Sequence, residues 1–510
     1  MATIVSPSNT RVLNSSLAQK IMSAEEAAAL IKSGDQIGMS GFTGSGYPKA
    51  VPIQLARRIA DANFRGQKFQ VSVFTGASTG PELDGALAMA GGIHLRLPYQ
   101  SDPETRKRIN AGEMEYMDIH LSHVAQFVEY GFLGKLDVAL IEVTAVLEDG
   151  RLIPSSSIGN NKTWLDQAER VILEVNSWQP AALEGMHDIY YGLQPPPNRG
   201  PIPLVRPGQR IGTPYLEVPA EKIAAIVLTD SPDRNSAFKA PDASSKRIAG
   251  HILEFLGWEV KKGRMPAHLL PLQSGVGNIA NAVLFGLEEG PFEGLTSYTE
   301  VIQDGMIRLL NSGKLTTASA TAFSLGPEMM TEVNAKMASY RDRIVLRPQE
   351  ISNHPEIIRR LGVIAMNGMI EADIYGNVNS THIMGSRMQN GIGGSGDFAR
   401  NGYLSIFMAP SSAKKGDIST IVPMVSHVDH TEHDVQVIVT ENGLADLRGL
   451  SPRRRARLII ENCANADYKS LLLDYYNRAE QTSPGKHTPH ILPESLSWHN
   501  RFVQTGKMLP

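Results

Sequence analysis

A single acidic residue stands out in the segment Ser297-Tyr-Thr-Glu300-Val-Ile-Gln-Asp-Gly305. Glu300 enters an apolar, strand-like stretch that closes at Asp-Gly, just before a helical pattern over residues 306–310. A carboxylate in a closed site can act as a nucleophile in covalent catalysis. On the local pattern alone, however, a glutamate in such a stretch is more often exposed or paired in a salt bridge than catalytic.

A turn with two glycines could present main-chain N–H groups to an anion. Gly275-Val276-Gly277-Asn278 follows an apolar run over residues 269–274 and begins a helical pattern over residues 278–287. Free N–H groups at a helix N-terminus suit a phosphate or a developing oxyanion. The same residues could also form nothing more than a tight connection between a strand and a helix.

A denser glycine segment, Asn390-Gly-Ile-Gly-Gly394-Ser-Gly396-Asp397, precedes an apolar strand pattern over residues 403–408. Four glycines in the seven residues from 390 to 396 cost much chain entropy, so they favour a close approach of the backbone to a ligand. A third glycine loop, Gly41-Phe-Thr43-Gly44-Ser-Gly46-Tyr-Pro, lies between a strand pattern at residues 36–40 and a helical pattern at residues 51–59.

Other polar segments have simpler explanations. His427-Val-Asp-His430-Thr-Glu-His433-Asp contains metal-ligating residue types, so zinc or iron must be considered. It lies between strand patterns at residues 421–425 and 435–439, and a polar turn without metal is the favoured explanation. Ser451-Pro-Arg-Arg-Arg-Ala-Arg457 is typical of a helix start with a solvated basic face. Cys463 is the only cysteine, which excludes an internal disulfide and predicts a buried structural thiol.

Strands that alternate with helices must position these groups, and they predict an α/β fold with mostly parallel sheets. The predicted strands of the first half are residues 36–40, 69–74, 138–143, 170–175 and 223–229. Ser23 and Glu26 have the spacing of a capping box for a helix over residues 24–32, with Gly34 as its C-cap; another helix is predicted over residues 82–90. Proline, glycine and polar residues between 194 and 245 predict a boundary near residue 230, with domains at 1–230 and 231–510.

Composition limits the function classes. A chain of 510 residues with a formal charge of −3 predicts two large domains and argues against a nucleic-acid binder that relies on a broad basic field. No stretch of about 18 uncharged apolar residues occurs. Because the first 25 residues also lack the order of a secretory signal, a cytoplasmic protein is expected.

The segments containing Lys49, Asn278, Glu300 and Arg400 closely resemble the acetyl-CoA hydrolase/transferase family. They read Gly-Phe-Thr-Gly-Ser-Gly-Tyr-Pro-Lys, Gln-Ser-Gly-Val-Gly-Asn, Tyr-Thr-Glu-Val-Ile-Gln-Asp-Gly and Gly-Ile-Gly-Gly-Ser-Gly-Asp-Phe-Ala-Arg. The resemblance runs in order from about Ser23 to the end, and within the family it is strongest to succinyl-CoA:acetate CoA-transferases. It implies two related α/β domains of the CoA-transferase type, with the active site between them and the nucleophile in the C-terminal one, and a homodimer.

The resemblance also assigns roles. Glu300 matches the nucleophile, and the main-chain N–H groups of Val276 and Gly394 match the oxyanion hole. Asn353 and Glu441 match positions that support the nucleophile. The residues expected to bind coenzyme A are Gly275, Val276, Gly277, Asn278, Asn390, Gly394 and Lys414. Gly41, Thr43, Gly44 and Gly46 are expected near the acyl carboxylate.

The chemistry fits a carboxylate nucleophile. Exchanging one thioester for another is nearly balanced in energy, so neither ATP nor a metal is needed, and no cofactor beyond coenzyme A as co-substrate is expected. Acyl-CoA and short-chain carboxylates, with succinate and acetate favoured, are the expected substrates. A hydrolase on the same framework and a non-catalytic CoA-binding regulator remain alternatives, and related eukaryotic hydrolases make mitochondria the alternative compartment.

Overall fold

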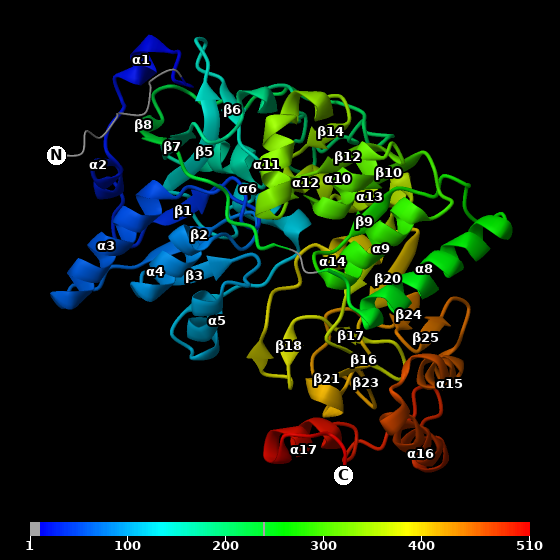
Figure 1. The fold of residues 1–510 in the computed structure, drawn as a ribbon. Helices are drawn as coiled ribbons and strands as arrows, with labels where there is room; N and C mark the ends of the chain where they lie inside the picture. The colour runs from blue at the N-terminus through cyan, green and yellow to red at the C-terminus, as the bar shows by residue number, and fades with distance from the viewer. Residues whose placement is uncertain (1–10, 238–239) are drawn as a thin grey trace. The chain divides into compact units, whose positions relative to one another are not determined.

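The chain, whose residues 11–237 and 240–510 are described by a computed structural model (Figure 1), forms two compact units. The first comprises the described residues up to Ala237 together with Tyr298–Asp304 and Thr317–Ile357. The second comprises the described part of Phe238–Ser297 together with Gly305–Thr316 and Ile358–Pro510. The segment with Glu300 therefore packs in the first unit, whereas the sequence placed it in a continuous domain over residues 231–510.

A largely parallel sheet organises the first unit. Its strands follow the order β4-β3-β2-β1-β5-β7-β8, and β6 adds an antiparallel partner to β5. The strands are β1 (Gln36–Met39), β2 (Val71–Phe74), β3 (Ile93–Leu97), β4 (Glu115–Tyr116), β5 (Val138–Val146), β6 (Leu152–Pro154), β7 (Arg170–Asn176) and β8 (Ile223–Thr229). The α/β class expected from the sequence is confirmed, because the strands are largely parallel and the central ones, β5 and β7, are buried along nearly their whole length.

Side-chain alternation along β1 shows how the helices cover this sheet. Ile37 and Met39 belong to a core cluster with residues of α2 (Ala24–Ala29), α3 (Ala50–Phe64) and α4 (Ala86–Met89). Gly38 faces the opposite side, where a Cβ would stand 2.7 Å from the Trp164 ring of α7 (Asn161–Gln167). Glycine at this position lets the tryptophan lie directly on the strand.

The start of α2 agrees with the prediction from the sequence, whereas its end does not. Ser23 and Glu26 form the expected capping box on α2. The helix ends at Ala29 with Leu30 as its C-cap, so the predicted extension to residue 32 and the Gly34 C-cap are wrong. Gly34 instead turns the chain into β1 at φ +93°, where its N–H donates to the carbonyl of Gln70.

Shorter elements complete the first unit. Its helical segments are α1 (Ser15–Ala18), a π-helical turn (Pro81–Gly85), α5 (Pro103–Asn110), a 3₁₀ turn (Leu121–His123), α6 (Val124–Glu129), a 3₁₀ turn (Ala181–Leu183), α11 (Pro327–Ala335), a 3₁₀ turn (Met337–Tyr340) and α12 (Gln349–Ser352). The parallel pair β11 (Val301–Gln303) and β13 (Ala322–Ser324) and the strand β14 (Ile344–Leu346) also belong here. Elements at the crossings between units are β10 (Leu295–Tyr298), α10 (Asp304–Asn311), β12 (Leu315–Ala320) and α13 (Pro355–Leu361).

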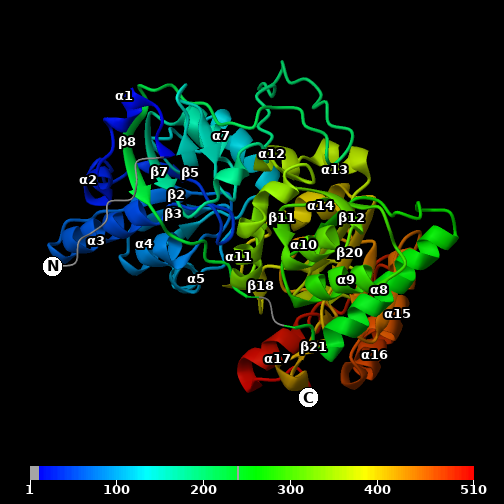
Figure 2. The same ribbon diagram turned by 45° about the horizontal axis from the view of Figure 1, so that its top comes forward.

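A second, largely parallel sheet has the strand order β14-β12-β10-β9-β15-β20-β24-β25. The strands of this sheet that belong to the second unit are most of β10 and all of β9 (Leu272–Ser274), β15 (Ile364–Gly368), β20 (Leu404–Met408), β24 (Val437–Thr440) and β25 (Gly443–Asp446), and β25 pairs antiparallel at the edge. The helices of the second unit are α8 (Ala243–Lys261), α9 (Asn278–Glu289), α14 (Ser395–Asn401), α15 (Pro452–Cys463), α16 (Ala466–Thr482) and α17 (Ser497–Thr505). Figures 1 and 2 both show α8 beside α9, and a separate core packs α15 and α16 against β20 and β24.

Small strands extend this unit. They are β16 (Glu371–Asp373), β17 (Val378–Asn379), β18 (His382–Ile383), β19 (Arg387–Met388), β21 (Ser412–Ala413), β22 (Ile418–Ser419) and β23 (Ile421–Val422), with a 3₁₀ turn at Lys414–Gly416. Over the parts of the chain that the structure describes, every helix is too short or too polar to cross a bilayer.

Candidate active site

Glu300 lies at the bend between β10 and β11, and it is half-buried. Its carbonyl oxygen accepts a hydrogen bond of 2.9 Å from the N–H of Thr321. The next residue, Val301, pairs in register with Ala322 of β13. Main-chain contacts on both sides therefore fix the backbone of Glu300, so its carboxylate is presented from a rigid position.

The side chain of Asn353 holds the Glu300 carboxylate. Its Nδ2 donates to Glu300 Oε1 at 3.0 Å, and Asn353 itself is fully buried at the end of α12. The amide is oriented in turn, because the Ser352 hydroxyl donates to Asn353 Oδ1 at 2.8 Å. A hydrogen bond to an ionised carboxylate favours the charged form, which is the form a nucleophile needs. Within the first unit, the structure thus places the predicted nucleophile and its predicted support together.

Tyr99 is a neighbour of Glu300 that the sequence analysis missed. The pKa of Tyr99 is raised to about 12, first by burial and then by the negative charges of Glu300 and Asp118. Tyr99 follows β3 directly, at the carboxyl end of a parallel strand, where ligand sites of open α/β sheets lie. That topological position was the only available signal, because no motif surrounds the residue.

The loop of residues 41–46, called the glycine loop below, follows β1 at the same edge of the sheet. Phe42 in this loop shares a buried apolar cluster with Leu121, Val301 and Ala322, and Tyr99 packs against it. The predicted acyl-carboxylate loop therefore lies beside the strand that follows Glu300. The order β3-β2-β1-β5 brings these segments to one edge although they are far apart in sequence.

Special backbone conformations shape the glycine loop. Gly41, Thr43 and Gly46 have φ of +122°, +56° and +63°. A Cβ on Gly44 would stand 2.5 Å from the carbonyl carbon of Arg234, and one on Gly46 would stand 2.4 Å from Ser157 Oγ. Glycine is needed where another segment approaches this closely, and a threonine at positive φ is strained, which is typical of functional loops.

In the second unit, residues 275–278 form an uncapped helix start. Gly277 is the N-cap of α9 with φ of +144°, and no side chain caps the helix. Val276 is 56% exposed and Asn278 is exposed, so the start of α9 lies at the surface. An exposed apolar residue beside unpaired main-chain donors fits a ligand site better than a closed structural turn.

A hydrogen bond to a neighbouring segment fixes the loop from Asn390 to Gly394. Asn390 Nδ2 donates to the carbonyl of Ser380 at 3.0 Å, and Gly394 is the N-cap of α14. Asp429 accepts hydrogen bonds from the N–H of Ser380 and the hydroxyl of Thr381. Asp429 belongs to the segment of residues 427–434, for which a metal site was considered. This segment holds Ser380, which in turn accepts the hydrogen bond from Asn390.

Histidines of that segment make similar contacts. His430 is 2% exposed, its Nε2 lies 3.2 Å from the hydroxyl of Ser395, and its ring packs on Phe407. In the described part of the chain, no group of three or more His, Cys, Asp or Glu side chains is placed to hold a metal. The segment has a structural role in supporting the Asn390–Gly394 loop.

Glu441 follows β24 and binds a neighbouring loop. Its Oε2 accepts the N–H of Ser411 at 2.7 Å and its Oε1 accepts the Ser411 hydroxyl at 2.6 Å. Ser411 follows β20, the strand next to β24, so both residues lie at the carboxyl edge of the second sheet. Val276 follows β9 and lies at that edge as well.

Lys414, expected to contact coenzyme A, lies in the turn between β21 and β22. It is exposed, and its Nζ lies 4.8 Å from the centre of the Phe502 ring. Lys414 and Lys415 both have positive φ, +48° and +60°. Two successive lysines in the left-handed region are uncommon, so the turn has a distinctive backbone conformation.

Known proteins share these features of sequence and fold. The N-terminal and C-terminal domain models of the acetyl-CoA hydrolase/transferase family match residues 6–228 and 330–476. A succinyl-CoA:acetate CoA-transferase of Clostridium kluyveri is 53% identical over 498 residues, which cover 98% of this chain and 92% of that protein. A propanoyl-CoA:succinate CoA transferase of Escherichia coli is 46% identical, covering 96% of this chain and 98% of its own.

A relative with another named activity is the acetyl-CoA hydrolase of Schizosaccharomyces pombe, 44% identical and covering 98% of both chains. Among solved structures, RipA from Yersinia pestis matches with a TM-score of 0.70 at 23% identity, over 91% of this chain and 98% of its own. The structural likeness shows the fold alone. The sequence matches span nearly the whole chain, so this chain belongs to the acetyl-CoA hydrolase/transferase family.

Proposed function

We propose that this enzyme transfers coenzyme A from succinyl-CoA to acetate through a glutamyl-CoA thioester on Glu300. The observation that carries the proposal is the half-buried Glu300 carboxylate, held at 3.0 Å by Asn353 beside the glycine loop. The relative from Clostridium kluyveri, a succinyl-CoA:acetate CoA-transferase, supports this choice of substrates.

The reaction proceeds in two mirrored halves. The Glu300 carboxylate attacks the thioester carbonyl, the coenzyme A thiolate leaves, and a mixed anhydride of succinate and Glu300 forms. The thiolate then attacks the glutamyl carbonyl, which releases succinate and leaves the enzyme thioester. Acetate attacks that thioester, and the freed thiolate takes the acetyl group, which restores the Glu300 carboxylate and releases acetyl-CoA.

Main-chain donors serve the oxyanions of this scheme. In the proposal, the N–H groups of Val276 and Gly394 stabilise each tetrahedral intermediate, and removing one such donor typically costs about 3 kcal/mol. Lys414 and the starts of α9 and α14 contact coenzyme A, and no further cofactor takes part. Homodimerisation and a cytoplasmic location stay predictions.

Intact mass spectrometry tests the proposal. After mixing with succinyl-CoA and removal of small molecules, the protein should gain the mass of coenzyme A less one water. Acetate should discharge this adduct with formation of acetyl-CoA. Glu300→Ala should form none, whereas Glu328→Ala, at an exposed position of α11, should behave as the unmodified protein.

Hydrolysis is the second candidate, because the Schizosaccharomyces pombe relative is named an acetyl-CoA hydrolase. In hydrolysis, water attacks the acyl or glutamyl carbonyl in place of the acceptor carboxylate. Release of free coenzyme A at the same rate with and without acetate would favour it. If neither adduct nor free coenzyme A appears, a CoA-binding regulator becomes the better explanation.

A further inference from the structure

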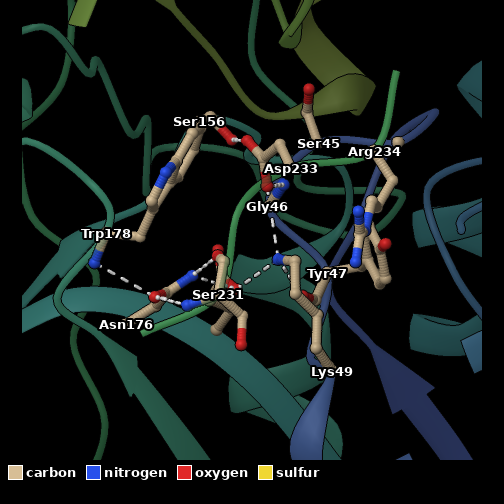
Figure 3. A network of polar contacts seen from close by, with 12 residues as sticks. Ser45, Gly46, Tyr47, Lys49, Ser156, Asn176, Trp178, Ser231, Asp233 and Arg234 are labelled. Carbon is tan, nitrogen blue, oxygen red and sulfur yellow. Dashed lines mark hydrogen bonds and ion pairs between the residues drawn. The ribbon is translucent and has the colours of Figure 1, made fainter. Parts of the chain in front are cut away.

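A buried carboxylate, that of Asp233, contacts the glycine loop (Figure 3). Its side chain is 2% exposed, and four groups donate hydrogen bonds to it. Oδ1 accepts the N–H of Gly46 at 3.1 Å and the ammonium of Lys49 at 3.2 Å. Oδ2 accepts the hydroxyl of Ser156 and the amide Nε2 of Gln179 at 3.2 Å. Each oxygen therefore has two donors, and a buried carboxylate so satisfied is rigid.

The residues that follow Asp233 clamp the same loop. The N–H of Arg234 donates to the carbonyl of Gly44 at 2.8 Å, and Asn235 Oδ1 accepts the N–H of Gly44 at 2.9 Å. Asn235 Nδ2 donates to the hydroxyl of Ser45 at 2.7 Å. The close approach of Arg234 to Gly44 leaves no room for a Cβ. Residues 233–235 thus form a clasp along one side of the glycine loop.

A ladder of main-chain bonds continues from Asp233 toward Glu300. Ser156, which donates to Asp233, accepts the N–H of Phe323 at its carbonyl, and Ile158 N–H donates to the carbonyl of Thr321 at 2.9 Å. The N–H of Thr321 donates in turn to Glu300. The loop expected to bind the acyl carboxylate and the nucleophile are therefore both tied, through a few hydrogen bonds, to one buried side chain.

We propose that Asp233 is a positioning residue that fixes the glycine loop relative to Glu300 and so determines how the acid substrate is aligned. This inference rests on the proposed function of Glu300 and the glycine loop. It assigns Asp233 no contact with substrate; the residue acts through Gly46, Lys49 and Ser156.

Only a carboxylate fits the site. An asparagine has the same shape, but its NH₂ group donates hydrogen bonds and cannot accept them. In one orientation this group would face the donors Gly46 and Lys49, and in the other it would face the donor Gln179. The charge matters as well, because Lys49 lies 2.7 Å from Glu142, and its ammonium stands between two acids. Burial alone would lower the pKa of Lys49, but the charges of Glu142 and Asp233 raise it overall.

Steady-state kinetics of Asp233→Asn give the main test, with Asp230→Asn as the matched control, three residues earlier at an exposed position. We expect the KM for acetate to rise about tenfold in Asp233→Asn, with a smaller fall in kcat, since a misplacement of 1 Å can cost roughly a hundredfold. A purely structural role would lower the active fraction, and hence the apparent kcat, without changing KM. An unchanged KM for acetate in a folded Asp233→Asn protein would overturn the inference.

Should Asp233→Asn fail to fold, Ser156→Ala decides the question. It removes one donor to Oδ2 without changing the charge, and the KM for acetate should rise about threefold, which corresponds to the loss of one ordinary hydrogen bond. No rise in Ser156→Ala would overturn the inference.

Amide exchange separates this inference from the proposed function. Peptides spanning residues 41–47 should exchange faster in Asp233→Asn or Ser156→Ala than in the unmodified protein and Asp230→Asn. Equal exchange in all four proteins would overturn the clasp whatever the enzyme does. Faster exchange in a protein whose unmodified form makes no adduct and transfers no coenzyme A would refute the proposed function instead.

Discussion

At the residue scale, the hydrogen bond from Asn353 orients the carboxylate of Glu300. Its loss in Asn353→Ala should cost about 2 kcal/mol, as for a hydrogen bond to a charged group, and slow formation of the enzyme thioester roughly thirtyfold. Single-turnover mixing with succinyl-CoA, followed by intact mass, measures this rate. Asn198→Ala, in an exposed loop, should leave it unchanged. A rate for Asn353→Ala equal to that of the control would mean that the bond does not orient the nucleophile.

Lys414 allows a residue-scale prediction about coenzyme A. Because the side chain is exposed, the loss of its charge in Lys414→Met should cost no more than about 1 kcal/mol and raise the KM for succinyl-CoA roughly fivefold. The KM for acetate should not change. Lys415→Met removes the same charge at the next residue, which shares the positive φ of Lys414, and it provides the matched control. If both variants raise the KM equally, the effect comes from the general charge of the turn and not from Lys414.

At the scale of elements, a buried contact between a histidine and a carboxylate joins α17 to β16. Glu371 is 4% exposed and lies 2.7 Å from His499 Nε2, and it also accepts the N–H and hydroxyl of Ser426. Burial would raise the pKa of Glu371, but these donors and His499 together lower it below its ordinary value. The stability that this provides is complete above the unfolded pKa of about 4.3 and is lost as the pH falls through the lower folded pKa.

Glu371→Gln should therefore lower the free energy of unfolding by about 2 kcal/mol at pH 7, because an amide cannot accept all the hydrogen bonds that the Glu371 carboxylate makes with Ser426 and His499. The difference between variant and unmodified protein should shrink as the pH falls below about 4.3. Urea unfolding at pH 7 and at pH 3 measures both. Glu461→Gln, at an exposed position of α15, should change little at either pH. A difference that stays constant over this range would show that charge does not contribute to the docking of α17.

The strands and helices show which parts of the fold could be predicted from the sequence. β5, β7 and β8 begin at the predicted residues, because strands buried on both faces are rich in Val, Ile, Leu and Ala and stand out in the sequence. The predicted helix at residues 82–90 is instead a π-helical turn followed by the short α4. In this turn Asp84 is buried, and it accepts hydrogen bonds from Arg96 and from the N–H of Thr79. Such non-local contacts leave no local pattern. For the same reason, Glu300 was recognised by resemblance, whereas Tyr99 and the clasp at Asp233 were not foreseen.

On the scale of the whole molecule, two large hydrophobic cores in the described part of the chain share no residues. One contains residues between Ala27 and Val227, and the other contains residues between Met369 and Met508. Domains with their own cores generally fold as units. The chain nevertheless passes repeatedly from one unit to the other, as Tyr298–Asp304 and Thr317–Ile357 show. Whether destabilisation of one unit reaches the other is therefore an experimental question, and the lone cysteine can answer it.

Cys463 is fully buried at the end of α15, and burial raises its pKa to about 12. Since the thiolate is the reactive form, a disulfide reagent at pH 8 should not label the native protein, and labelling should appear in guanidinium only as the second unit unfolds. Glu371→Gln, in that unit, should move the labelling midpoint to lower guanidinium. Asp84→Asn, which breaks the buried pair with Arg96 in the first unit, should move it less.

The labelling curves of the two variants decide between independent and joint unfolding. Cys463→Ala is the control for reagent consumption, and unfolding followed by circular dichroism confirms that each variant is destabilised to a similar extent. A larger shift for Glu371→Gln would mean that the second core alone protects the thiol. Equal shifts would show that the repeated crossings of the chain make the two units unfold as one cooperative system, and rapid labelling of the native protein would contradict the burial of Cys463 itself.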